Sequence, residues 1–216
     1  MEKNDFYTLG QKHKTDKVLH HRYDRFYDIF LSRLREKEIV LFEIGAGYGE
    51  SFTMWHEYFP KGKIFSMDIG AIRWEEWGEI FLGDQSSLSD LKKAKEKIGY
   101  CDVIVDDGSH IPEHQIESFI YLFQEVLKPG GIYIIEDIEC SFWNPQAEIY
   151  GYKVGNHNIL NFLSSVPYEI NSEFSNLKNK FGISMVSYGQ NCIILTKKTE
   201  EEEEFTSREY RFKSLL

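Results

Sequence analysis

The hydrophobic positions of this chain fall into short apolar runs that alternate with longer amphipathic segments. Runs typical of buried strands occur at 39–44, 63–67, 80–82, 103–105 and 132–135. Between them, apolar residues recur with the period of a helix at 51–58, 88–97 and 112–127. Strands that alternate with helices in this way are joined by crossover connections, so the pattern predicts a parallel sheet.

The segments outside this alternation are less regular. Residues 1–21 are mostly polar and are predicted to form a lead-in loop, whereas 22–36 show the rhythm of an amphipathic helix. A helical pattern over 146–166 is interrupted by Gly151 and Gly155, so we expect a break there.

The last apolar runs predict how the sheet ends. A short glycine-containing connection joins the runs at 183–188 and 192–196, as is typical of a hairpin. With the earlier runs they predict an α/β fold: a Rossmann-like, doubly wound, mostly parallel seven-stranded sheet with a C-terminal antiparallel hairpin. We expect an N-terminal lead-in and helix, a ligand-binding domain, and an acidic then basic-aromatic tail at 1–37, 38–198 and 199–216.

Composition limits the function classes without selecting one. The 216 residues, 42% of them hydrophobic, suit one folded α/β domain. A formal net charge of -10 argues against a nucleic-acid partner. Without a signal-peptide pattern or an apolar stretch near the ~20 residues of a membrane span, we expect a cytoplasmic protein with no membrane partner. Three cysteines without metal-ligand spacing are expected to be free thiols: Cys101, Cys140 and Cys192.

Candidate chemistry begins where the first strand ends. The sequence LFEIGAGYGESF places Gly45, Gly47 and Gly49 after the apolar run, with Glu43 two residues before the first glycine. Such a turn lets a ligand approach bare backbone, although a tight turn without a ligand has the same composition. The dinucleotide fingerprint would need a glycine at Glu50, which argues against a dehydrogenase. The spacing and the preceding acid resemble motif I of class I S-adenosylmethionine (SAM) methyltransferases.

Polar residues at the next strand ends are further candidates, because ligands of doubly wound sheets bind there. Asp68 ends the second strand and could accept both ribose hydroxyls of a nucleoside; otherwise it is an ordinary turn aspartate. Asp84 or Gln85, after the third strand, could take the adenine amine, whereas Ser86 or Ser87 could simply cap a helix.

The fourth and fifth strands end in four carboxylates and a histidine. Crowded carboxylates repel one another and raise their pKa values unless a cation lies between them. Hard oxygen donors suit Mg²⁺, and no cysteine lies among them to suggest structural zinc. A histidine beside the metal could take a proton near neutral pH. Loop capping or pairing with a lysine is the structural alternative for these residues: Asp106, Asp107, His110, Glu136 and Asp137.

Several of these segments together resemble a known family. The segments VIVDDGSHIPEHQ and LKPGGIYIIEDIECSFW, with an earlier TDK followed by H-x-Y, are similar to the metal-dependent sugar O-methyltransferases of macrolide biosynthesis and to cephalosporin hydroxylase-like relatives. The resemblance covers roughly residues 10–145. It implies Mg²⁺ or Mn²⁺ on Asp107, Glu136 and Asp137, with His110 as the general base.

The same resemblance implies SAM as the cofactor. Its expected contacts are Glu43, Gly45, Gly47, Gly49, Asp68, Asp84, Gln85 and Asp106. The favoured interpretation is a SAM- and metal-dependent O-methyltransferase that acts on a hydroxyl of a sugar or glycosylated small molecule. A methyltransferase for a catechol or other vicinal diol, and a non-catalytic Rossmann-like binding module, are the alternatives. Whether the chain forms homo-oligomers is left open.

Residues 140–166 follow the expected metal ligands and are predicted to form a mobile lid over the acceptor. Gly151 and Gly155 interrupt the segment and could permit closure. Its aromatic side chains have flat faces that suit a sugar ring, although they could instead pack on the core: Phe142, Trp143, Tyr150 and Tyr152.

Overall fold

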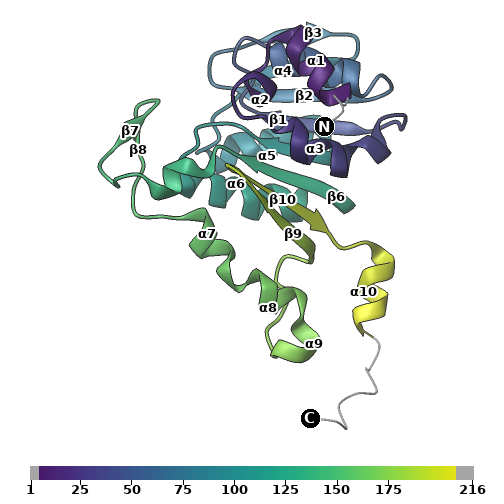
Figure 1. Ribbon diagram of the computed structural model, residues 1–216, viewed down its shortest axis with the longest axis vertical. Coiled ribbons are helices and arrows are strands. Elements are labelled where there is room, and N and C mark those ends of the chain that lie inside the picture. Colours follow the sequence, from purple (N-terminus) through teal and green to yellow (C-terminus); the bar gives the residue numbers. More distant parts are fainter. Residues whose placement is uncertain (1–4, 208–216) are drawn as a thin grey trace.

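The computed structural model describes residues 5–207. Its centre is an eight-stranded sheet (Figure 1). The strand order is β3-β4-β2-β1-β5-β6-β10-β9. The neighbours from β4 to β6 pair in parallel, whereas β3 and β10 are antiparallel to β4 and β6, and β9 to β10. The bounds are β1 Val40–Ile44, β2 Lys63–Asp68, β3 Arg73–Glu75, β4 Gly78–Leu82, β5 Cys101–Asp106, β6 Leu127–Glu136, β9 Ile183–Gly189 and β10 Cys192–Lys197.

The predicted fold class is confirmed, and the sheet has one strand more than predicted. Each predicted apolar run lies in a strand, and the C-terminal pair forms the expected antiparallel hairpin. The addition is β3, a three-residue edge strand. Its residues alternate over too short a stretch to give a period-two pattern, because a strand signal needs at least about four residues.

Helices cover both faces of the sheet, which explains why its central strands read as continuous apolar runs. Side chains of adjacent residues in β1 point to opposite faces. Leu41 packs in the cluster that contains Trp55, whereas Phe42 packs in the cluster that contains Phe119. The helices of the central part are α4 Glu50–Tyr58, α5 Leu88–Ile98 and α6 Pro112–Glu125.

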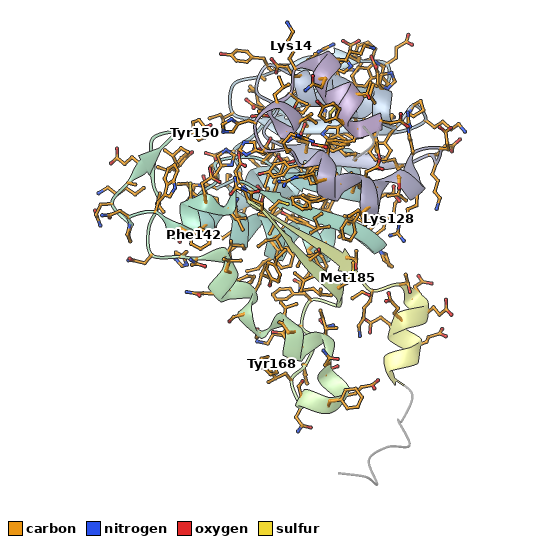
Figure 2. The ribbon with its side chains drawn as sticks, in the orientation of Figure 1. Lys14, Lys128, Phe142, Tyr150, Tyr168 and Met185 are labelled. Carbon is orange, nitrogen blue, oxygen red and sulfur yellow. The ribbon has the colours of Figure 1, made fainter. Side chains whose placement is uncertain are left out.

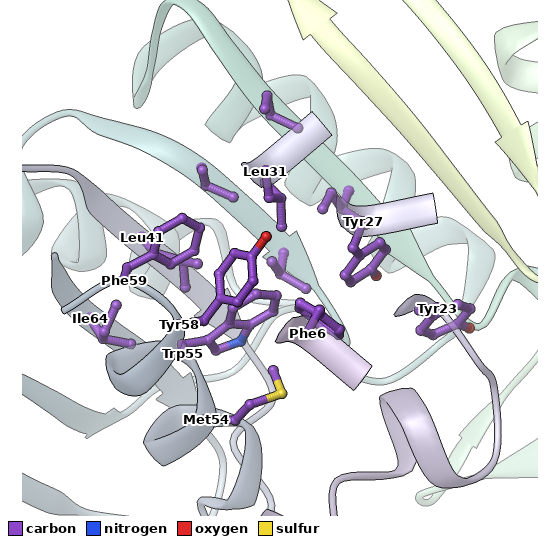
Figure 3. Packing of buried hydrophobic residues seen from close by; sticks show 14 of the residues in the cluster. Phe6, Tyr23, Tyr27, Leu31, Leu41, Met54, Trp55, Tyr58, Phe59 and Ile64 are labelled. Carbon is purple, nitrogen blue, oxygen red and sulfur yellow. The ribbon is translucent and has the colours of Figure 1, made fainter. Parts of the chain in front are cut away.

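The loop predicted for residues 1–21 is wrong over its described part. Residues 5–19 contain two helices, α1 (Asp5–His13) and α2 (Asp16–Leu19). Phe6 is fully buried, and its ring lies 5.3 Å from the rings of Tyr27, Trp55 and Tyr58 (Figure 3). One buried phenylalanine in a polar helix gives little periodicity, so this tertiary contact could not be read from the pattern.

The amphipathic helix predicted over 22–36 is present but shorter. It forms α3 (Asp24–Leu31), which continues as the 3₁₀ turn η1 (Ser32–Leu34). Tyr27 and Leu31 of α3 are fully buried and join the cluster around Phe6 and Trp55. The N-terminal helices therefore complete one face of the sheet.

The helix predicted over 146–166 is wrong in its first half. A small hairpin, β7 (Glu148–Ile149) and β8 (Tyr152–Lys153), projects from the body of the molecule (Figure 1). Tyr150 and Gly151 have φ values of 51° and 82°, the positive values that a two-residue hairpin turn requires. The expected break is therefore a turn, and short helical segments follow it: α7 Ile159–Phe162, η3 Leu163–Ser165, α8 Val166–Ile170 and α9 Ser172–Ser175.

The acidic run after the sheet forms a helix, α10 (Glu200–Ser207), and the basic-aromatic segment that was assigned to the tail falls largely at 208–216, outside the described residues. The three cysteines are buried and unpaired, as expected. Within residues 5–207, no helix has both the length and the apolar character needed to cross a membrane.

Candidate active site

A cavity of about 760 Å³ opens at the carboxyl ends of the parallel strands. This is the edge at which doubly wound sheets bind ligands. The wall includes the glycine turn after β1, Asp68 after β2, Asp84 after β4, and a group that follows β5 and β6. Tyr150 and Tyr152 of the β7–β8 hairpin also line it, and Figure 2 labels Tyr150 on this hairpin. The structure thus brings part of the predicted strand-end residues into one cavity wall.

The glycine turn lies close to the loop that follows β5. A side chain at Gly45 would place its Cβ 2.0 Å from the carbonyl oxygen of Asp107, so only glycine fits. Gly47 also has a positive φ, but a Cβ there would meet no atom within 4 Å. The turn therefore exposes bare backbone at Gly47, whereas Gly49 is the N-cap of α4 and does not line the cavity.

Glu43 lies behind the turn and does not line the cavity. Its carboxylate is fully buried and accepts hydrogen bonds from Ser51 Oγ, Ser66 Oγ and Trp55 Nε1. Burial raises the pKa of this carboxyl group. Glu43 was expected to contact the cofactor. In the structure its carboxylate instead binds residues behind the turn and so helps to hold the turn in place.

Asp68 lines the cavity and holds the glycine turn. One carboxylate oxygen accepts the backbone N–H groups of Ala46 and Gly47, and the other accepts those of Gly70 and Ala71. Partial burial opposes ionisation, but these four hydrogen bonds outweigh it and lower the pKa of Asp68. The residue is thus an ionised turn aspartate, and a ribose would have to share its oxygens with the backbone.

Asp84 and Gln85 lie after β4, and only Asp84 has an oxygen bonded to the hairpin. Its carboxylate accepts Tyr152 Oη at 2.9 Å and Ser86 Oγ at 2.7 Å. Gln85 is buried and binds Asp106 through Nε2 at 2.6 Å. The amide of Gln85 also accepts the backbone N–H of Ser109. Gln85 therefore ties two loops together, and Asp84 is the better placed of the two candidates.

Asp106 does not face the cavity, which corrects the prediction that it contacts the cofactor. It is fully buried among Gln85, Ser118 and Tyr133, and accepts Ser118 Oγ at 2.6 Å. Burial raises its pKa to about 6. Its side chain points into the fold because it is the last residue of β5, on the face covered by α6.

Asp107, His110 and Asp137 converge at one wall. One possible ligand atom from each lies within 4.8 Å of those of the other two. His110 Nε2 is 3.9 Å from Asp137 Oδ2, and buried His110 Nδ1 has no hydrogen-bond partner among the described residues. Two carboxylates fit a divalent cation that prefers oxygen donors, with open positions for a further ligand, and the imidazole beside them is placed to act either as a ligand or as a base.

Glu136 is not in this group, although the resemblance predicts it as a metal ligand. Its carboxylate accepts hydrogen bonds from Lys17 Nζ at 2.9 and 3.0 Å and from Tyr27 Oη at 2.6 Å. Burial and the nearby charge of Asp107 raise its pKa well above the ordinary value. The side chain is thus held directly behind the cavity wall, one residue before Asp137.

The side chain of Asp137 is held in place by three residues to which the sequence pattern gave no role at the site. Tyr23 Oη donates to Asp137 Oδ1 at 2.5 Å, and Asn191 Nδ2 donates to the same oxygen at 2.9 Å. His21 Nδ1 lies 3.4 Å from that oxygen. Burial and the charge of Asp107 raise the pKa of Asp137. The H-x-Y pair was visible as part of the resemblance, but Asn191 gave no signal because it lies in a hairpin connection 54 residues away.

Lys17 is the other residue that pattern reasoning missed. Its side chain is fully buried, and its ammonium contacts Glu43, Asp107 and Glu136. Burial alone would lower its pKa, but the three carboxylates raise it well above the usual value. The lysine belongs to the TDK segment, so its sequence neighbourhood was noticed and its role was not.

The fold and the site together define a class. A parallel sheet that ends in the order β6-β10-β9, with β10 antiparallel, and a glycine turn at its ligand-binding edge form a Rossmann-like methyltransferase fold. A structure of the MycE methyltransferase from the mycinamycin biosynthetic pathway, in complex with Mg, SAH and mycinamycin VI, matches 93% of this chain and 55% of that one, with a TM-score of 0.78 and 28% identity.

Sequence relatives point the same way. The chain is 33% identical over 144 residues to 8-demethyl-8-alpha-L-rhamnosyl tetracenomycin-C 2'-O-methyltransferase of Streptomyces olivaceus, covering 62% of this chain and 38% of the relative. It is 36% identical over 132 residues to demethylmacrocin O-methyltransferase of Streptomyces fradiae, covering 57% and 33%. The chain thus spans about two fifths or less of these relatives. No family model matches it.

The predicted resemblance is therefore confirmed. The chain has the fold of a class I SAM-dependent methyltransferase and is homologous, over part of their length, to sugar O-methyltransferases that include the tetracenomycin and macrocin enzymes. MycE, which matches nearly the whole chain, binds Mg and SAH in its structure.

Proposed function

We propose that this chain is a SAM-dependent, divalent-metal-dependent O-methyltransferase that transfers a methyl group to a hydroxyl of a sugar or glycosylated small molecule. One observation carries the proposal: a single cavity joins an open glycine turn to the group formed by Asp107, His110 and Asp137. The first half suits SAM, and the second suits the activation of a hydroxyl. The named activities of the relatives favour a sugar over a catechol as the acceptor. Three buried, unpaired thiols are in keeping with action in the cytoplasm.

The cavity wall supports a definite placement of the cofactor. The amino-acid part of SAM would lie along the turn from Gly45 to Gly47, whose backbone is open at Gly47. Asp68 would accept the ribose hydroxyls, and Asp84 would accept the adenine amine. In this placement the methyl group would point toward the wall formed by Asp107, His110 and Asp137.

The acceptor side would use the residues at the ends of β5 and β6. Asp107 and Asp137 would hold the metal, whereas Glu136, the third ligand expected from the resemblance, could join them only by giving up its bonds to Lys17 and Tyr27. When bound, the metal lowers the pKa of a coordinated hydroxyl. His110 Nε2 accepts the hydroxyl proton, and Asp137, 3.9 Å away, stabilises the resulting imidazolium.

The transfer itself needs positioning more than further activation. The acceptor oxygen attacks the methyl carbon in line with the sulfur, so that a C–O bond forms as the C–S bond breaks. The sulfonium receives the electron pair and leaves as a neutral thioether. The proton ends on His110, and atoms and charges balance.

The β7–β8 hairpin supports a lid over this site, as part of the lid expected at 140–166. Tyr152 bonds to Asp84 on the cofactor side, and the ring of Tyr150 lies 5.8 Å from that of His110 on the acceptor side. The 65% exposure of Tyr150 leaves its flat face available to a sugar ring. We propose that this hairpin, rather than the whole segment, closes over the substrates.

Binding and transfer assays test the proposal. Thermal unfolding with SAM, NAD and Mg²⁺ added separately should show stabilisation by SAM and Mg²⁺ and none by NAD, because a ligand stabilises only the state that it binds. Methyl transfer from labelled SAM should then be compared between a deoxyhexose glycoside and a catechol. Stabilisation by SAM with transfer only to the catechol would favour the vicinal-diol alternative, and no stabilisation by SAM would overturn the proposal.

A further inference from the structure

A buried ammonium group lies directly behind the proposed metal site. Lys17 of α2 has no exposed side-chain surface. Its Nζ is 2.5 Å from Asp107 Oδ2, 2.9 Å from Glu136 Oε2 and 3.3 Å from Glu43 Oε1. These acids come from β1, from the residue after β5 and from the end of β6. One cation from the N-terminal helices therefore binds three acids of the ligand-binding edge.

The arrangement reaches beyond an ordinary buried ion pair, because Asp107 belongs to two clusters. One of its oxygens binds Lys17, and the residue also lines the cavity with His110 and Asp137. A divalent ion held by Asp107 and Asp137 would share this carboxylate with the ammonium. Two cations on one carboxylate repel each other strongly where water is excluded.

We propose that Lys17 is a positioning residue that acts as a built-in counter-ion of the metal site. It keeps Glu43, Asp107 and Glu136 together, and it competes with the divalent ion for the charge of Asp107, which limits metal affinity. The inference rests on the metal site of the proposed function. It adds that the TDK segment, far from the strand ends in sequence, tunes how tightly the ion binds.

The direction in which metal affinity changes when Lys17 is removed distinguishes a competing counter-ion from a purely structural residue. A lysine that only held the fold together would, on removal, loosen Asp107 and weaken metal binding. A competing counter-ion would, on removal, leave three buried acids without their cation. The folded chain would then lose stability in the absence of metal and bind the metal more tightly, because the metal supplies the missing positive charge.

The test compares Lys17→Met with Lys12→Met in the full chain. Lys12 is on the neighbouring helix, is 60% exposed and pairs with Glu57 at the surface, so it controls for the loss of a charge near the N-terminus. Mg²⁺ and Mn²⁺ affinities are measured by calorimetry, and the midpoint of thermal unfolding is measured with and without Mg²⁺. We expect Lys17→Met to unfold at a lower temperature without metal, to be stabilised more by Mg²⁺ and to bind it at least about tenfold more tightly. Lys12→Met should bind Mg²⁺ like the parent.

A second variant keeps the test decisive if Lys17→Met does not fold. The double variant Lys17→Met with Glu43→Gln removes one charge of each sign, so it should fold and bind Mg²⁺ more tightly than the parent. If the parent binds Mg²⁺ and each Lys17 variant that folds binds it equally or more weakly, Lys17 is only structural and this inference is wrong. If the parent binds SAM but no Mg²⁺ or Mn²⁺, the metal site of the proposed function is wrong, and this inference with it.

Discussion

At the scale of single residues, two of the seven described non-glycine residues with a positive φ are groups proposed for catalysis. His110 and Asp137 have φ values of 60° and 50°, which non-glycine residues rarely adopt. Such conformations cost on the order of 1–3 kcal/mol and persist where surrounding contacts enforce them. Tyr23 and Asn191 supply these contacts for Asp137. The contacts of Asp137 therefore hold its side chain in place at the cavity wall, in a conformation that the backbone alone would disfavour.

Asp68 should be required for SAM binding. Asp68→Ala removes the proposed ribose acceptor and frees the N–H groups of the glycine turn, so calorimetry should show SAM affinity at least about tenfold weaker, or 1.4 kcal/mol. Asp102→Ala is a matched control, because Asp102 also accepts a backbone N–H, that of Val40, at the opposite end of the sheet. It should leave the affinity unchanged. A smaller loss in Asp68→Ala than tenfold would leave Asp68 as a turn residue only.

His110 should matter for turnover and not for cofactor binding. His110→Ala removes the proposed base and should lower the rate of methyl transfer by about two to four orders of magnitude. SAM affinity, measured in parallel, should stay near that of the parent because His110 lies on the acceptor side. His157→Ala, a change at a half-exposed histidine beside Glu113, is the control. Unchanged turnover in His110→Ala would assign the proton to another group.

The candidate site could be predicted only where its residues follow strands. Asp107, His110 and Asp137 were found because parallel strands end at one edge, so neighbours in the sheet become neighbours in space. Lys17 lies 90 residues from Asp107 in the chain, and no local pattern reports such a contact. The pattern also could not show which way Asp106 points. Adjacent strand-end residues point to opposite sides, so only one of Asp106 and Asp107 can face the cavity.

At the scale of elements, predictability followed the length and regularity of each hydrophobic pattern. The central strands and α4 to α6 were recognised because their apolar positions repeat over a full element. The hairpin β7–β8 was not, because its strands have two residues each and Gly151 was read as a break in a helix. The helix α1 was missed because its burial depends mainly on Phe6, whose partners lie elsewhere in the chain.

The hairpin should show lid behaviour in hydrogen exchange. Residues 148–153 should exchange fast in the free chain and slowly with SAM, Mg²⁺ and a true acceptor, because closure buries the turn against both substrates. Tyr152→Phe removes the bond to Asp84 and should speed exchange in the free chain. Residues 166–175 of α8 and α9, which do not line the cavity and lie away from the hairpin in Figure 1, are the internal control and should not change. Equal protection of residues 148–153 in both states would make the hairpin a fixed wall.

At the scale of the whole molecule, the N-terminal helices contribute both to the packing of the core and to the geometry of the candidate site. The same segment that buries Phe6 against Trp55 also places Lys17 under Asp107 and Tyr23 beside Asp137. The rings of Tyr23 and Tyr27 stack 5.4 Å apart between these two regions. Loss of this packing is therefore expected to reach the cavity as well as the core.

Phe6 tests that connection. Phe6→Ala leaves a cavity among aromatic rings and should lower the free energy of unfolding by about 3–5 kcal/mol, measured by denaturant titration. Mg²⁺ affinity should fall as well, because Phe6 packs on Tyr27, whose ring stacks on that of Tyr23, the residue that holds Asp137. Phe142→Ala, at a ring that is 69% exposed, should change the free energy of unfolding by less than about 0.5 kcal/mol. A destabilised Phe6→Ala with parental Mg²⁺ affinity would show that the two are independent.

Removal of the metal should affect the whole molecule as well as the reaction. Asp107, Glu136 and Asp137 bring formal negative charges to one edge of a chain whose net charge is already -10, and Lys17 balances only part of this charge. Excess chelator should therefore abolish methyl transfer and lower the unfolding temperature, and added Mg²⁺ or Mn²⁺ should restore both. SAM binding should persist under chelation, since neither the glycine turn nor Asp68 belongs to the group that would hold the metal. Full turnover in excess chelator would show that these carboxylates are structural groups and that His110 acts alone.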